Sequence, residues 1–88
     1  MSKEEKMIQR LLSVPSDYTY TEAKALASRF RYQEQNKGST SGSRVMLFRP
    51  EDGRKILLHK PHPGDIMKKY AVRQFLERLI ENGDIDHE

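Results

Sequence analysis

Cysteine is absent from this 88-residue sequence, which excludes a disulfide scaffold, a thiolate metal site and a catalytic thiol. No apolar run approaches the roughly 20 residues that a membrane span needs. The first residues, Met1 to Lys6, are charged and are not followed by the apolar segment of a secretory signal. We therefore expect a cytoplasmic protein with no membrane association, folded as a single domain over residues 1–88.

Basic residues are concentrated in the middle of the chain. The segment from Lys24 to Arg73 holds twelve Lys and Arg residues against four acidic ones, whereas the tail from Glu77 to Glu88 is acidic. A concentrated basic segment is typical of a protein that binds a polyanion or an acidic partner. An ordinary solvated surface is the alternative, because a third of the chain is charged.

Three segments have the pattern of helices. Apolar residues recur at helical spacing over residues 3–13 and over residues 68–82. Pro15 follows the first segment and Gly83 the second, and both residues are typical just after the end of a helix. Thr19 and Glu22 have the spacing of a capping box and predict that another helix begins near Tyr20.

Between the second and third helices the period changes to that of strands. A polar strand is predicted over residues 31–36, and two more are predicted over 45–48 and 55–59. Residues 50–53, Pro-Glu-Asp-Gly, form the predicted turn between the last two strands. The Gly-Ser-rich segment 37–43 is expected to be a flexible loop. The order α-α-β-β-β-α predicts an α+β fold, a three-stranded antiparallel sheet with helices on one face.

The turn also sets an expected register between the last two strands. With the centre of the turn at residues 51–52, Leu47 pairs with Ile56 and Arg44 pairs with His59. Because strand side chains alternate between faces, one face would hold the core residues Val45, Leu47, Ile56 and Leu58. The other face would combine apolar and cationic side chains, namely Arg44, Met46, Phe48, Lys55, Leu57 and His59. A shift of one residue in the strand register would separate Arg44 from His59.

The order of motifs in this region resembles the HicA toxin family. The resemblance rests on the Gly-Ser segment from Gly38 to Val45, on Phe48, on the turn from Asp52 to Arg54, on Ile56 and on the segment from His59 to Asp65. It covers about residues 20–82 and leaves the helix at 3–13 as an addition. It implies a fold like a double-stranded-RNA-binding domain, cleavage of mRNA without a metal or other cofactor, and neutralisation by a HicB-like antitoxin.

One position departs from the family pattern. The family typically has Gly-Ser-His at the start of its second strand, and that histidine is the proposed catalytic one. Here the matching residues are Gly42, Ser43 and Arg44, or Val45 when the count runs back from Gly53. Arginine stays protonated at pH 7 and cannot act as a general base. Either His59 or His62 is then catalytic, or the protein is a degraded relative that binds RNA or the antitoxin without efficient cleavage.

Cleavage of RNA by its own 2′-hydroxyl needs a base, an acid and cations beside the phosphate. His59 is the candidate base, and His62 is a second proton carrier. The candidate phosphate-binding residues are Ser43, Arg44, Lys55, Lys60, Lys68, Lys69 and Arg73. The candidate antitoxin-binding residues are Met46, Phe48 and Leu57, an apolar patch beside cations. The alternative for both histidines is a surface position without a chemical role, and a structural or DNA-associated adaptor is a further class.

Two other groups of residues have a possible chemical role. His59, His62 and Asp65 are close in sequence, but Pro61 and Pro63 restrict how they can converge, so we expect no metal site. Tyr18, Tyr20 and Tyr32 are expected to pack in the core, and the alternative is that their rings stack on RNA bases.

Overall fold

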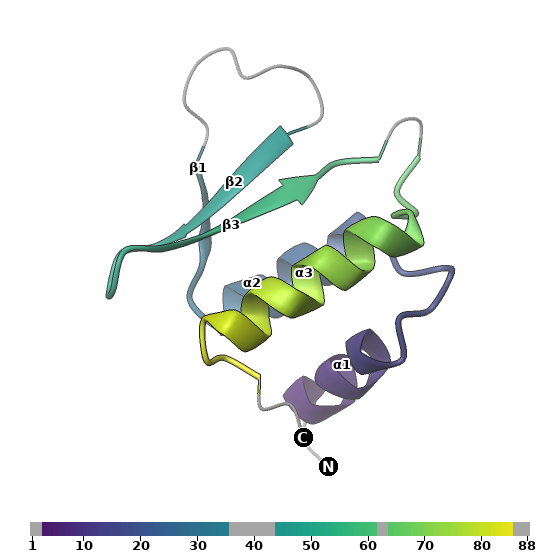
Figure 1. The fold of residues 1–88 in the computed structure, drawn as a ribbon, viewed down its shortest axis with the longest axis horizontal. Coiled ribbons are helices and arrows are strands. Elements are labelled where there is room, and N and C mark those ends of the chain that lie inside the picture. The colour runs from purple at the N-terminus through teal and green to yellow at the C-terminus, as the bar shows by residue number, and fades with distance from the viewer. Residues whose placement is uncertain (1–2, 36–43, 62–63, 86–88) are drawn as a thin grey trace.

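The computed structural model describes residues 3–35, 44–61 and 64–85 and confirms the predicted order of elements. Figure 1 shows the sheet on one side of α2 and α3, with α1 beyond these two helices. This α+β arrangement is consistent with a fold like a double-stranded-RNA-binding domain. The elements are α1 (Lys3–Leu12), α2 (Tyr20–Arg29), β1 (Gln33–Gln35), β2 (Arg44–Arg49), β3 (Arg54–His59) and α3 (Lys69–Glu81).

The ends of α2 and α3 follow from local hydrogen bonding. The Thr19 hydroxyl accepts from the Glu22 amide while the Glu22 carboxylate accepts from the Thr19 amide, so the predicted capping box is present. At the end of α3, Gly83 has a φ of 82°, and the Gly83 and Asp84 amides donate to the Ile80 and Leu79 carbonyls. Glycine suits this left-handed position because it has no Cβ.

The first strand is shorter than predicted because α2 closes through residues 31 and 32. Arg31 adopts a φ of 74°, and the amides of Arg31 and Tyr32 donate to the carbonyls of Ser28 and Ala27. These two residues therefore end the helix, and the strand begins at Gln33. The predicted end of the strand, residue 36, and the predicted loop 37–43 lie outside the described residues.

The sheet has the strand order β1-β2-β3, and both pairings are antiparallel. The predicted register is confirmed, since Leu47 is opposite Ile56 and Arg44 is opposite His59. Leu47, Ile56 and Leu58 are buried in the core with the inner faces of the helices. The three tyrosines at 18, 20 and 32 are also in this core, as predicted, and base stacking on their buried rings is excluded.

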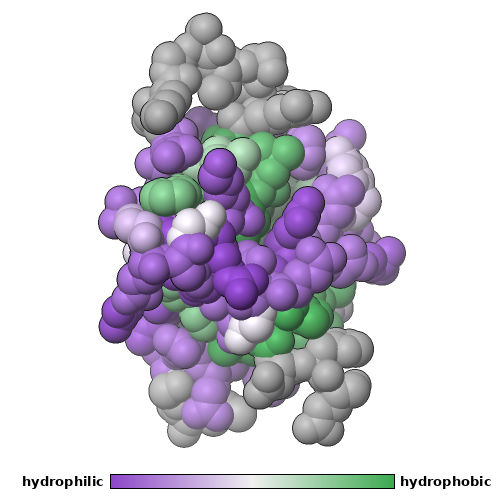
Figure 2. All heavy atoms as spheres, turned by 60° about the vertical axis from the view of Figure 1, so that its left-hand side comes forward, coloured by the Kyte–Doolittle hydropathy of each residue, from purple (hydrophilic) through white to green (hydrophobic). Residues whose placement is uncertain are grey.

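The surface around the β2–β3 turn is largely hydrophilic. Figure 2 brings this side of the molecule forward and shows apolar atoms mainly in recesses between hydrophilic side chains. No helix in the described ranges is long and apolar enough to cross a membrane.

Candidate functional site

The candidate site lies at the end of the sheet opposite the β2–β3 turn. Arg44 is the first residue of β2 and His59 the last residue of β3, and their Cα atoms are partners across the two strands. The His59 side chain is half-buried. Because paired residues share a face of the sheet, the backbone register assigns Arg44 and His59 to the same face. The predicted site residues Ser43 and His62 lie outside the described residues.

The start of α3 lies at the same end of the molecule (Figure 1). The segment before α3 is tied to the start of α2, because the Tyr20 amide donates to the Asp65 carbonyl and the Met67 amide donates to the Tyr18 carbonyl. The Asp65 carboxylate accepts from the Thr21 amide at 3.3 Å. These contacts hold the segment before α3 against the start of α2. On the other side, the first turn of α3 lies beside β3, where the ring centroids of His59 and Tyr70 are 6.5 Å apart.

Four exposed cationic side chains belong to the segments that lie at this end of the molecule. Their sequence positions are Lys60 after β3, Lys68 and Lys69 at the start of α3, and Arg73 one turn further on. None of the four forms an ion pair with a described carboxylate. Exposed cations that form no ion pair with a described residue favour the binding of an anion such as a phosphate.

The predicted residue Lys55 is not part of this cluster. It is exposed and lies opposite Phe48, near the β2–β3 turn. It lies four positions before His59 in β3, which is roughly 13 Å along a strand.

A groove of about 270 Å³ runs between β3 and α3, with His59 at its wall. Leu57 and His59 line it from the strand, and Gln74, Glu77, Arg78 and Glu81 line it from the helix. The walls are polar and include two carboxylates. Within the described ranges, no three His, Asp or Glu side chains are grouped closely enough to hold a metal ion.

The open face of the sheet carries the predicted apolar patch of Met46, Phe48 and Leu57. Met46 is opposite Leu57 in the register, and Phe48 is one pair nearer the turn. Leu57 is 37% exposed, whereas Met46 and Phe48 are half-buried. The patch therefore lies on the same face as Arg44 and His59, as predicted.

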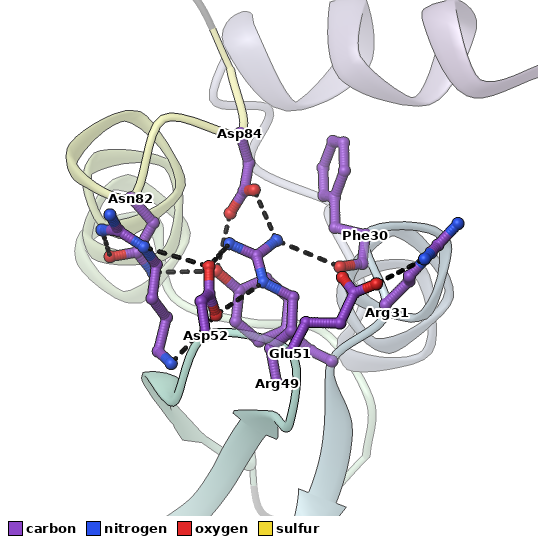
Figure 3. A network of polar contacts seen from close by, with 9 residues as sticks. Phe30, Arg31, Arg49, Glu51, Asp52, Asn82 and Asp84 are labelled. Carbon is purple, nitrogen blue, oxygen red and sulfur yellow. Dashed lines mark hydrogen bonds and ion pairs between the residues drawn. The ribbon is translucent and has the colours of Figure 1, made fainter.

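A polar network at the other end of the sheet was not predicted from the sequence. Figure 3 shows the Arg49 guanidinium between the carboxylates of Asp52 and Asp84. Its Nη1 donates to Asp84 Oδ1 at 2.6 Å and to the Phe30 carbonyl at 3.1 Å. The guanidinium also lies 4.6 Å from the centre of the Tyr32 ring. The network joins the hairpin to the ends of α2 and α3, so its role is to hold the sheet on the helices.

Tyr32 extends this network and predicts a dependence of stability on alkaline pH. Its hydroxyl donates to Asp84 and accepts from Asn82, and burial together with the Asp84 carboxylate raises the pKa of Tyr32 to about 12. The unfolded value is about 10. The protonated phenol therefore stabilises the fold fully below pH 10, and this contribution is lost as the pH rises from 10 to 12.

We expect urea unfolding between pH 8 and 12 to show this loss. In Tyr32→Phe the free energy of unfolding should fall less steeply above pH 10, by up to about 1.4 kcal/mol per pH unit. The remaining slope belongs in part to Tyr20, whose pKa burial raises to about 12. An unchanged slope in Tyr32→Phe would show that the pKa of Tyr32 is the same in the folded and unfolded states.

The sequence model of the HicA toxin of bacterial toxin–antitoxin systems matches residues 22–79. The match runs from α2 into α3 and includes every strand, while α1 precedes it. Comparisons with curated proteins and with solved structures gave no match. Because the match covers more than half of the chain and the fold agrees with it, the protein belongs to the HicA family and is a toxin of a toxin–antitoxin system.

Proposed function

We propose that this toxin binds mRNA and cleaves it without a metal, at the end of the sheet where Arg44 pairs with His59. The observation that carries the proposal is this cross-strand pair, together with four exposed cations on the adjoining segments that form no ion pair with a described carboxylate. The pair brings together a residue type that can transfer a proton near neutral pH and one that binds phosphate through a fork of donors. The family assignment supports the same function.

The chemistry requires no group outside the protein and the RNA. The His59 imidazole takes the proton of a ribose 2′-hydroxyl, and the 2′ oxygen forms a bond to the adjacent phosphorus. The bond from phosphorus to the 5′ oxygen breaks, and that oxygen receives a proton from an acid, for which His62 is the sequence candidate. The products are a 2′,3′-cyclic phosphate and a 5′-hydroxyl, and Arg44 and Lys60 neutralise charge that builds on the phosphate.

Induced expression in bacteria without the antitoxin tests the proposal. We expect growth arrest with the wild type and none with His59→Ala, while His87→Ala is the matched control outside the family match and should arrest growth. Immunoblots confirm equal amounts of each variant. Arrest that persists in His59→Ala and disappears in Arg44→Ala would favour RNA binding over proton transfer.

A second candidate function is an interaction module without efficient cleavage. Two observations favour it: Arg44 or Val45, and not histidine, matches the position of the family histidine, and no described element covers the apolar patch of Met46, Phe48 and Leu57. An apolar patch with cations at its edge suits an acidic antitoxin surface. Antitoxin binding at this patch is compatible with either function.

Phe48→Asp is expected to weaken the complex with the cognate antitoxin at least tenfold, because it places a charge in the centre of the patch. Isothermal titration calorimetry with the purified antitoxin measures the Kd. Gln9→Asp is the control, since Gln9 is exposed on α1 and gains the same charge away from the open face of the sheet. Equal affinity of Phe48→Asp and wild type would place the antitoxin on another surface.

A further inference from the structure

Tyr70 differs from the other tyrosines of the chain in its exposure. Tyr18, Tyr20 and Tyr32 are each at most 5% exposed, whereas Tyr70 is 54% exposed on the first turn of α3. Its hydroxyl forms no hydrogen bond with a described residue. This aromatic side chain does not pack in the core, because Tyr70 is not among the buried residues of α3.

The Tyr70 ring lies beside the proposed base of the cleavage reaction. Its centroid is 6.5 Å from that of His59, and the two ring planes are inclined by 53°. This distance and inclination describe a tilted pair of rings in contact range and not a parallel stack. Because Tyr70 is 54% exposed, a planar group can still approach it next to the imidazole.

The charges next to Tyr70 are positive. Lys68 and Lys69 precede it directly, and Arg73 follows one turn later, all exposed and without an ion pair to a described carboxylate. The nearest acidic residue on α3 is Glu77, two turns from Tyr70. An aromatic ring among cations suits single-stranded nucleic acid, whose bases stack while its phosphates meet the cations.

We propose that Tyr70 is a stacking platform for one unpaired base of the RNA and thereby positions the adjoining ribose at His59. This inference rests on the proposed function and adds a specificity for single-stranded RNA. In a duplex the neighbouring base pairs cover both faces of each base, so the platform selects an unpaired nucleotide. Tyr70 is a positioning residue because it holds the substrate and transfers no proton.

Tryptophan fluorescence tests the stacking directly. The chain contains no tryptophan, so Tyr70→Trp carries a single reporter at the platform, and Gln9→Trp carries one on the exposed surface of α1 as the matched control. Both variants are titrated with 2′-O-methyl single-stranded RNA, which cannot be cleaved through its 2′ oxygen. We expect the fluorescence of Tyr70→Trp to be quenched on binding and that of Gln9→Trp to stay unchanged.

Affinity provides the second readout. Anisotropy of labelled 2′-O-methyl RNA should show that Tyr70→Ala weakens binding by about 5- to 150-fold while Tyr70→Phe binds like wild type, since one stacked base contributes about 1–3 kcal/mol. Two results would refute base stacking on Tyr70 without contradicting the proposed function. One is RNA binding by Tyr70→Trp without quenching, and the other is equal affinity of Tyr70→Ala and wild type. Absence of binding by wild type would overturn both. Weakened antitoxin binding in Tyr70→Ala with unchanged RNA affinity would assign Tyr70 to the protein interface instead.

Discussion

Replacing His59 with alanine is expected to slow RNA cleavage by about 10²- to 10⁴-fold, the usual contribution of a positioned general base. The physical reason is that none of the cationic residues around His59 can accept a proton at neutral pH. Single-turnover cleavage of a 5′-labelled single-stranded RNA measures the rate without contributions from product release. Binding of the same RNA should change little, because the four cations remain in place.

His59→Gln is the companion variant. Glutamine keeps a polar side chain of similar reach at the end of β3 but transfers no proton, so its cleavage rate should be as low as that of His59→Ala. A rate near wild type in both variants would remove His59 from the chemistry. A rate restored only in His59→Gln would mean that the side chain positions the RNA through a hydrogen bond.

Arg49→Ala is expected to lower the free energy of unfolding by about 3–5 kcal/mol, because it leaves the Asp84 carboxylate buried without its cationic partner. The side chains of Arg49 and Asp84 are 10% and 8% exposed. The loss is large against the roughly 5–15 kcal/mol by which a domain is stable. Urea unfolding followed by circular dichroism measures it.

Arg54→Ala is the matched control for Arg49→Ala. Arg54 also pairs with Asp52, but its side chain is 46% exposed, so its loss should cost less than about 1 kcal/mol. The double variant Arg49→Ala with Asp84→Ala should recover part of the stability, since both charges are then removed. Equal effects of Arg49→Ala and Arg54→Ala would contradict the anchoring role of the buried pair.

The features that the sequence predicted correctly are those that short segments determine. A Pro-Glu-Asp-Gly turn between two short apolar strands limits the hairpin to few registers, and the observed one follows from the centre of the turn. The capping box predicts where α2 begins because its two partners, Thr19 and Glu22, are only three positions apart in the sequence. The pairing of Arg44 with His59 is a direct consequence of the same turn.

The missed features depend on contacts between distant segments. Arg49 appears in the sequence as one more basic residue before a turn, yet its partner Asp84 lies 35 residues away. In the sequence, Tyr70 is one aromatic residue among flanking positive charges. Its position beside the site follows from its distance to His59 in the folded chain. Its position off the apolar stripe of α3 was the available signal, because an aromatic residue outside that stripe has no core to enter.

The most direct test of the central claim is cleavage by the purified wild type in EDTA of two oligonucleotides with the same sequence. One is a single-stranded RNA, and the other contains 2′-deoxyribose throughout. We predict that the RNA is cut to products with 2′,3′-cyclic phosphate ends and that the deoxy strand stays intact. Cleavage of both strands would contradict attack by the 2′ oxygen, and cleavage of neither would contradict ribonuclease activity and leave the interaction module as the function.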